Sequence, residues 1–213
     1  MEHQILIVSA GIFHPSLLSR FWLQRALRAM PGFGFRRVPS LERLPAMTLD
    51  VFQSLVLYFH HTRLSTQALA CLDAFVRRGG GMLAVHSASA SFKQQPIYHH
   101  IIGGRFTAHG PVTDFRVEPA DPSDETLGRQ PAFWVRDELY RHAWDPANRV
   151  HFATSVGGSW EPVVWTRRHG QGKVAYLALG HTPTALRHPA VRQILQRSLA
   201  WVCRPEPAGE AEP

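Results

Sequence analysis

Three short, continuous apolar runs constrain the fold of this chain more than any other feature of its sequence. They occupy residues 4–9, 55–59 and 82–85, and residues 33–38 form a weaker run of the same kind. A strand that is buried on both faces reads as an unbroken apolar run, and such strands occur mainly in parallel sheets covered by helices on both sides. These runs therefore predict an α/β fold with three layers.

Segments with helical spacing separate and follow the runs. Residues 15–30 place apolar side chains at helical intervals and are stopped by a Pro-Gly pair. Ser65 is a suitable N-cap for a second helix, which should end at the glycines of residues 79–81. Pro189 begins a third amphipathic segment. Strands that alternate with helices in this way predict parallel connections between neighbouring strands.

The second half of the chain is less regular. Residues 115–117 are strand-like, and residues 118–130 form a polar loop. Residues 163–168 and 173–179 flank a short turn that contains two glycines, which predicts an antiparallel hairpin. We therefore expect a three-layer α/β fold with a mostly parallel sheet and an antiparallel hairpin near the C-terminus.

Length and composition favour one domain. The chain has 213 residues, of which 45% are apolar, so a sizeable core can be buried. We expect this domain over residues 1–203 and a disordered Pro/Glu tail over residues 204–213. Cys71 and Cys203 are too few for a disulfide framework or a four-thiolate zinc site, and we expect both to be reduced.

The sequence carries no targeting or membrane signal. No run approaches the roughly 20 apolar residues of a membrane span, and the N-terminus lacks the basic segment of a signal peptide. We therefore expect a cytoplasmic protein without membrane contact.

The net charge of +7 comes almost entirely from arginine, because Lys93 and Lys173 are the only lysines. Nucleic-acid binders gather basic residues on one face or arm and interleave aromatic side chains. Here the arginines are scattered along the chain in isolated pairs. This dispersion argues against a nucleic-acid partner, whose binding would show a steep dependence on salt.

Candidate functional residues follow the apolar run at residues 82–85 and a further apolar run at residues 174–179. His86 directly follows residues 82–85, and His181 follows the run at residues 174–179 through one glycine. Ligands of open α/β sheets bind outside the carboxyl ends of the strands, where these histidines should project. Two polar segments, residues 103–109 and 137–140, supply further titratable groups. The candidate catalytic residues are His86, His109, Glu138 and His181, and the candidate substrate-binding residues are Ser87, Arg105, Asp137 and Tyr140.

Other chemistries remain open at these positions. His86, His109 and His181 are candidate ligands of a divalent metal such as zinc or manganese, although the sequence has no helical HExxH pattern and requires no cofactor. Ser87 could act as a nucleophile, but the glycines of a G-x-S-x-G elbow are absent around it. Each histidine taken alone could equally be a hydrogen-bonded structural residue.

The same segments, taken together, resemble a known family. The shared motifs, in order along the chain, are Gly79-Gly80-Gly81, Val85-His86-Ser87-Ala88, Ile102-Gly103-Gly104-Arg105-Phe106 with His109, Asp137-Glu138-Leu139-Tyr140, Pro162-Val163-Val164-Trp165, Gly170-Gln171-Gly172-Lys173-Val174 and Leu179-Gly180-His181. Over roughly residues 4–202 the sequence is similar to the trehalose-utilisation (ThuA-like) domain family.

The resemblance implies a flavodoxin-like α/β fold related to class I glutamine amidotransferases, but without their chemistry. In those relatives a cysteine stands at the position of His86, and the catalytic histidine corresponds to His181. Their acidic residue, two positions further on, is here Pro183. With both the thiol and the acid missing, the Cys-His-Glu triad cannot operate.

The family is associated with the catabolism of trehalose and related disaccharides, beside an oxidoreductase that makes 3-keto sugars. Two functions therefore stand open. One is a sugar-processing enzyme that transfers a proton on a keto-sugar, as a lyase or isomerase does, with a small carbohydrate as its partner. The other is a non-catalytic module that binds a ligand or another protein. Neither the substrate nor the oligomeric state follows from the sequence, and a homo-oligomer is compatible with it.

Overall fold

A computed structural model describes residues 2–12, 15–127 and 129–204 of the chain. The strands are β1 (His3–Ser9), β2 (Phe33–Val38), β3 (Ser54–Tyr58), β4 (Gly81–Val85), β5 (Gly104–His109), β6 (Thr113–Pro119), β7 (Phe133–Asp137), β8 (Tyr140–Trp144), β9 (Arg149–Val156), β10 (Ser159–His169) and β11 (Gly172–Leu177). The α-helices are α1 (Leu17–Arg28), α2 (Thr66–Arg77), α3 (Pro96–Ile102), α4 (Pro183–Arg187) and α5 (Pro189–Cys203). Short 3₁₀ helices are η1 (Leu41–Ala46), η2 (Leu49–Val51) and η3 (His86–Ala90).

Nine strands form one sheet in the order β2-β1-β3-β4-β11-β10-β9-β6-β7, and β5 pairs with β8 in a separate antiparallel ribbon. The first five strands of this order are parallel to one another. The predicted hairpin is present as β10 and β11, and β9, β6 and β7 continue the antiparallel part beyond it. The sheet is therefore mixed, with a parallel half and an antiparallel half.

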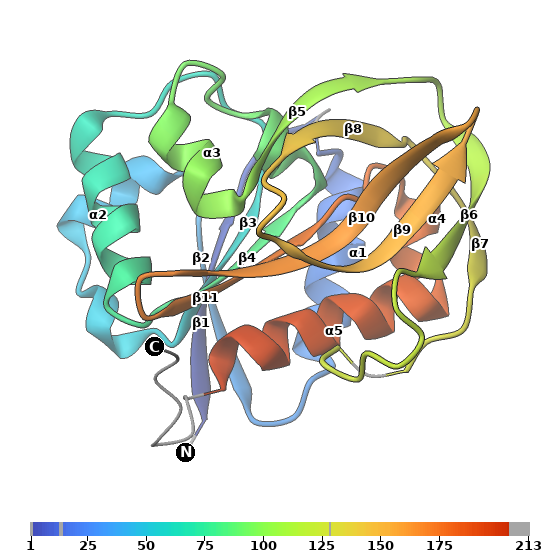
Figure 1. The fold of residues 1–213 in the computed structure, drawn as a ribbon. Coiled ribbons are helices and arrows are strands. Elements are labelled where there is room, and N and C mark those ends of the chain that lie inside the picture. The colour runs from blue at the N-terminus through green and yellow to red at the C-terminus, as the bar shows by residue number, and fades with distance from the viewer. Residues whose placement is uncertain (1, 13–14, 128, 205–213) are drawn as a thin grey trace.

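Helices cover the sheet on both faces, as the three-layer prediction requires. Helices α1, α4 and α5 pack together on one face, and α2 and α3 lie on the other (Figure 1). The N-cap predicted for α2 is confirmed, because Ser65 Oγ accepts a hydrogen bond of 3.2 Å from the backbone N–H of Ala68. The apolar face expected for α1 is buried only in its second half: Ala26 and Leu27 are buried, whereas Leu17, at the start of the helix, is 60% exposed.

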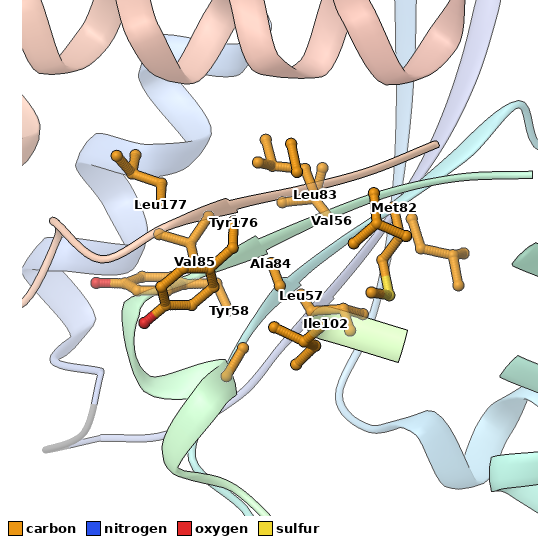
Figure 2. Close-up of a cluster of buried hydrophobic side chains, with 14 of the residues drawn as sticks. Val56, Leu57, Tyr58, Met82, Leu83, Ala84, Val85, Ile102, Tyr176 and Leu177 are labelled. Atoms are coloured by element: carbon orange, nitrogen blue, oxygen red, sulfur yellow. The ribbon is translucent and has the colours of Figure 1, made fainter. Parts of the chain in front are cut away.

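The central strands β3, β4 and β11 carry the core. Every residue of these three strands is buried, and Ile102 at the end of α3 joins the cluster of buried side chains on one face of the strands (Figure 2). Continuous burial on both faces explains why β3 and β4 could be predicted from unbroken apolar runs in the sequence. Because the core holds β4 and β11 side by side and parallel, their carboxyl ends meet at one edge of the sheet.

No helix in the described ranges is long and apolar enough to cross a membrane. Cys71 and Cys203 are both free thiols, as expected, and burial raises the pKa of Cys203 to about 11. The tail predicted over residues 204–213 lies outside the described residues, apart from Arg204.

Candidate functional site

The strand β4 ends at a strained residue that presents an imidazole at the sheet edge. His86 follows Val85 directly and has a φ of 44°, which lies in the left-handed region that side chains with a Cβ rarely adopt. Its carbonyl accepts hydrogen bonds from Tyr176 Oη at 3.0 Å and from Ser89 Oγ at 3.2 Å. These bonds compensate for the strain, which costs on the order of 1–3 kcal/mol.

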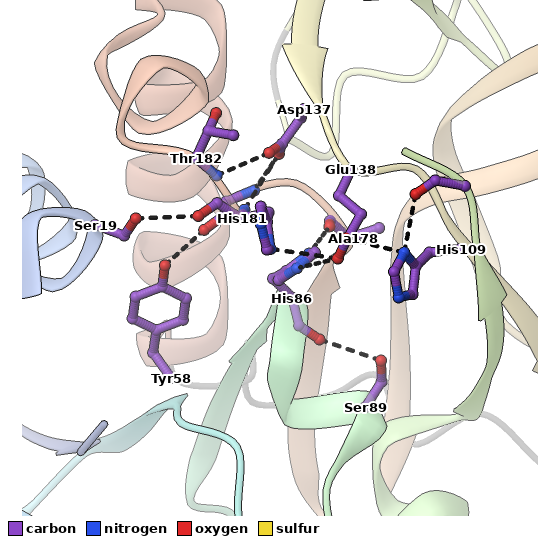
Figure 3. Close-up of polar contacts among 12 residues, drawn as sticks. Ser19, Tyr58, His86, Ser89, His109, Asp137, Glu138, Ala178, His181 and Thr182 are labelled. Carbon is purple, nitrogen blue, oxygen red and sulfur yellow. Dashed lines mark hydrogen bonds and ion pairs between the residues drawn. The ribbon is translucent and has the colours of Figure 1, made fainter. Parts of the chain in front are cut away.

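The imidazole of His86 is fixed in orientation. Its Nδ1 donates a 2.7 Å hydrogen bond to the carbonyl of Ala178, just beyond β11, and its ring packs on Tyr140 with centroids 3.9 Å apart. The ring is almost completely buried, with 1% exposure. The other ring nitrogen, Nε2, therefore points in a single direction, towards Glu138 (Figure 3).

Glu138 is the centre of the cluster. It lies in the turn between β7 and β8 and is buried. Its Oε2 is 3.6 Å from His86 Nε2 and 3.3 Å from His181 Nδ1, and its Oε1 is 2.9 Å from His109 Nδ1. One buried carboxylate is thus surrounded by three imidazoles from three different parts of the chain (Figure 3).

Asp137 holds the loop that carries His181. Its carboxylate accepts backbone hydrogen bonds from Gly180 at 2.6 Å, His181 at 3.3 Å and Thr182 at 2.9 Å. The residue is completely buried, and it is committed to this loop rather than directed towards solvent. Ser19 of α1 adds a hydrogen bond of 3.0 Å to the carbonyl of His181, so the loop is fixed from both sides.

The electrostatics favour an ionised carboxylate beside a neutral imidazole. Burial raises the pKa of Glu138, but the surrounding imidazoles outweigh burial and hold that pKa below its ordinary value. Burial lowers the pKa of His181, and the nearby His86 ring lowers it further, although Glu138 acts in the opposite direction. At pH 7, Glu138 is therefore charged and His181 is neutral.

Exposure separates the cluster into a buried and an accessible part. The side chains of His86 and Glu138 are 1% and 8% exposed, whereas those of His181 and His109 are 26% and 45% exposed. A small molecule arriving from solvent therefore meets the rings of His109 and His181 first.

Three of these residues have the composition of a metal site. His86, Glu138 and His181 each offer one ligand atom, and these atoms all lie within 4.8 Å of one another. The sequence suggested three histidines and a carboxylate as a candidate metal site. In the structure the carboxylate nearest these histidines is that of Glu138, and His109 lies on its other oxygen.

The predicted catalytic residues come together, whereas two predicted binding residues do not face the cluster. Ser87 is completely buried, and its hydroxyl makes no hydrogen bond within the described part of the chain. Arg105 lies at the opposite end of β5 from His109, where it lines a separate hollow of about 460 Å³ beside Trp144. Tyr140 is in the cluster as a packing surface for His86.

The support beneath His86 was not anticipated from the sequence. His142 Nε2 lies 3.0 Å from Tyr176 Oη and 3.2 Å from Ser89 Oγ, and these two hydroxyls are 2.8 Å apart. The network is buried and ends on the carbonyl of His86. The inward-facing position of His142 on β8 carries no sequence signal, because the strand itself was not predicted.

Comparisons with known proteins agree with this architecture. The family model ThuA, described as trehalose utilisation, matches residues 4–202. No curated protein matches the sequence. Among solved structures, a ThuA-like protein from Parabacteroides merdae is 17% identical with a TM-score of 0.84, over 95% of this chain and 90% of that one. A ThuA-like protein from Bacteroides uniformis is 15% identical with a TM-score of 0.76, over 95% and 91%. A cytoplasmic protein from Salmonella typhimurium is 10% identical with a TM-score of 0.70, over 93% and 99%.

Proposed function

The chain belongs to the ThuA family, the family of trehalose utilisation, and from this premise we propose that it processes a carbohydrate by acid–base chemistry. The substrate class is a keto-sugar derived from a disaccharide. The reaction is the removal of a proton from a carbon atom next to the ketone. The observation that carries the proposal is the pairing of the accessible His109 with the buried carboxylate of Glu138.

The contacts of His109 fix the position of its proton. Nδ1 lies 2.9 Å from Glu138 Oε1 and 2.9 Å from the carbonyl oxygen of Gly110. Because a carboxylate and a carbonyl only accept hydrogen bonds, Nδ1 carries the hydrogen. The neutral ring then has its lone pair on Nε2, and the ring is 45% exposed. His109 is therefore oriented as a general base, and Glu138 stabilises the imidazolium that forms when it takes a proton.

The reaction also needs a polar group that faces the ketone oxygen of the substrate and stabilises the negative charge that develops there. When His109 Nε2 takes the proton, the electron pair of the C–H bond moves into the ketone and gives an enolate. In a lyase reaction the electron pair of the enolate then forms a carbon–carbon double bond, and the bond between the neighbouring carbon and the glycosidic oxygen breaks. The glycosidic oxygen takes up a proton and leaves as an alcohol. In an isomerase reaction the proton returns to a different carbon. His181, the other accessible imidazole of the cluster, lies beside the base and is the polar group that would face such an enolate.

The experiment follows hydrogen exchange and turnover of 3-keto-trehalose in D₂O by NMR. His109→Gln should lower the rate by about 10²–10⁴, the range typical of a lost general base. Glu138→Gln should also lower it, because the amide does not stabilise an imidazolium. The matched control is His100→Gln, an exposed histidine outside the cluster, which should retain the full rate.

Three outcomes decide the proposal. Exchange that depends on His109 supports it, and an unchanged rate in His109→Gln refutes the assigned base. Binding of the keto-sugar without exchange or turnover also refutes the enzymatic proposal, and indicates the non-catalytic binding module instead.

The wider setting is part of the same proposal. An enzyme that consumes a keto-sugar needs an oxidoreductase that oxidises a sugar hydroxyl to the ketone, so we place the two in one reaction sequence. We propose the cytoplasm as their location, in keeping with the cytoplasmic protein of Salmonella typhimurium that shares this fold.

A further inference from the structure

We propose that His86 Nε2, His181 Nδ1 and Glu138 Oε2 bind one divalent transition-metal ion of the zinc type. The inference deepens the proposed function and takes its catalytic meaning from it, since the ion would lie beside the base His109. The metal site would use Glu138 Oε2, the oxygen that faces His86 and His181. The proposed base, His109, contacts the other oxygen, Oε1.

The first argument is the orientation of His86. Its Nδ1 lies 2.7 Å from the carbonyl oxygen of Ala178, so this nitrogen carries the hydrogen. When the ring is neutral, it presents a lone pair on Nε2, and the atom opposite, 3.6 Å away, is Glu138 Oε2, which also has only lone pairs. Two acceptors that face each other in a buried site repel, and a cation between them turns this repulsion into binding.

The second argument is the state of Glu138 Oε2. This buried oxygen accepts no hydrogen bond in the described part of the chain, although imidazole nitrogens lie at 3.3 and 3.6 Å. These separations exceed the 2.7–3.2 Å of ordinary N–H···O bonds. They are close to the roughly 3.4 Å between neighbouring ligands of a tetrahedral ion with bonds of about 2.1 Å.

The third argument is the support around the ligands. A metal-binding histidine usually donates its other ring N–H to a carbonyl or a carboxylate, as His86 does to Ala178. A ligating carboxylate is usually hydrogen-bonded through its other oxygen, as Glu138 is to His109. Asp137 fixes the loop of the third ligand, His181. Two histidines and one glutamate are a known ligand set of catalytic zinc, which leaves a fourth position for water or a substrate oxygen.

The metal would strengthen the stabilisation of the enolate in the proposed reaction. A divalent ion polarises a ketone and stabilises the enolate oxygen as it develops. Imidazole ligands favour zinc and similar transition metals over magnesium and calcium, which prefer oxygen ligands. The alternative occupant is a single proton that makes His86 an imidazolium, and the experiment separates the two.

The test measures metal binding without any sugar. The full chain is dialysed against a chelator, and then titrated with Zn²⁺ by equilibrium dialysis and with Co²⁺ by its visible absorption. We expect one ion per chain and a cobalt spectrum of low coordination number. His86→Gln, Glu138→Gln and His181→Asn should each weaken binding by about 10²-fold or more, because each removes a ligand.

Controls keep the test independent of folding and of activity. His100→Gln, which alters an exposed histidine outside the cluster, should bind zinc like the parent protein. His181→Asn alters the most accessible ligand, so it keeps the test valid if the variants of His86 or Glu138 do not fold; circular dichroism identifies those that do.

The outcomes also separate this inference from the proposed function. Absence of a bound ion, or unchanged affinity in His181→Asn, overturns the metal site, and proton exchange on the keto-sugar can still succeed without metal. A bound ion in a protein that does not act on any keto-sugar leaves the metal site standing and overturns the proposed function.

Discussion

His142 should make the protein lose stability as the pH falls from 7 to 5. The ring lies beneath the site, where its Nε2 contacts Tyr176 Oη and Ser89 Oγ and its Nδ1 has no hydrogen-bond partner in the described part of the chain. Trp165 packs against it edge-on, with centroids 5.2 Å apart. A second proton would therefore place a charged N–H in buried surroundings. Burial, with a smaller contribution from the nearby His86 ring, lowers the pKa of His142 to about 3.

The sign and size follow from linkage between protonation and folding. In the unfolded chain the pKa of His142 is about 6.5, so the unfolded state binds a proton in a pH range where the folded state does not. Above pH 6.5 the neutral ring of His142 therefore does not lower the free energy of unfolding. Below that pH the free energy of unfolding declines steadily until the pH reaches about 3. At pH 5 the loss is about 2 kcal/mol, from 1.36 kcal/mol for each pH unit below the unfolded pKa.

The assay compares urea unfolding of the parent protein and His142→Gln at pH 7 and pH 5, after dialysis against a chelator. The variant retains a polar side chain that cannot titrate, so other groups contribute equally to the pH dependence of both proteins. We expect the parent to lose about 2 kcal/mol more than the variant between the two pH values. Equal losses in the two proteins would refute the reasoning, and so would an NMR titration that shows His142 protonated in the folded state at pH 5.

Two further predictions concern the loop after β11. Asp137→Asn should lower the free energy of unfolding by about 2–4 kcal/mol, because a buried carboxylate that accepts three backbone N–H groups is lost. The control Asp114→Asn, at an exposed ion pair, should lower it by less than about 1 kcal/mol. Urea unfolding measures both variants, and equal losses would contradict the role of Asp137 in holding the loop. Gly180→Ala should destabilise by about 1–3 kcal/mol and weaken zinc binding, because φ is 122° and a Cβ would lie 3.3 Å from Val85 Cγ1. Gly157→Ala, with φ of 60° and open space around it, is the matched control, and it should leave zinc binding unchanged.

The parallel half of the sheet was predictable because of the way it is buried. Strands β3 and β4 are covered on both faces, so their sequences are unbroken apolar runs that turns and helices delimit. Strands β7 and β8 alternate buried and exposed residues over five positions, as in Phe133–Asp137. Such short alternating segments, rich in charged and aromatic residues, differ little from a loop in sequence. The extent of the antiparallel half therefore emerged only from the structure.

The position of the candidate site could likewise be predicted only in part. His86 and His181 follow neighbouring parallel strands, so the rule for carboxyl ends places them at one edge. Nothing local places His109 and Glu138 there, because β5 and the turn between β7 and β8 reach the edge through tertiary packing. Arg105 lies apart from the cluster for a simple geometric reason: four residues along a strand separate it from His109 by about 13 Å.

The strained turn at His86 is best explained by what its ring does. A glycine would adopt a φ of 44° at little cost, whereas an imidazole there costs on the order of 1–3 kcal/mol. Two hydroxyls hold the carbonyl of His86, and the carbonyl of Ala178 fixes its ring. The turn directs His86 Nε2 at the buried carboxylate of Glu138, and either a proton on this nitrogen or a metal ion between the two atoms would offset their repulsion.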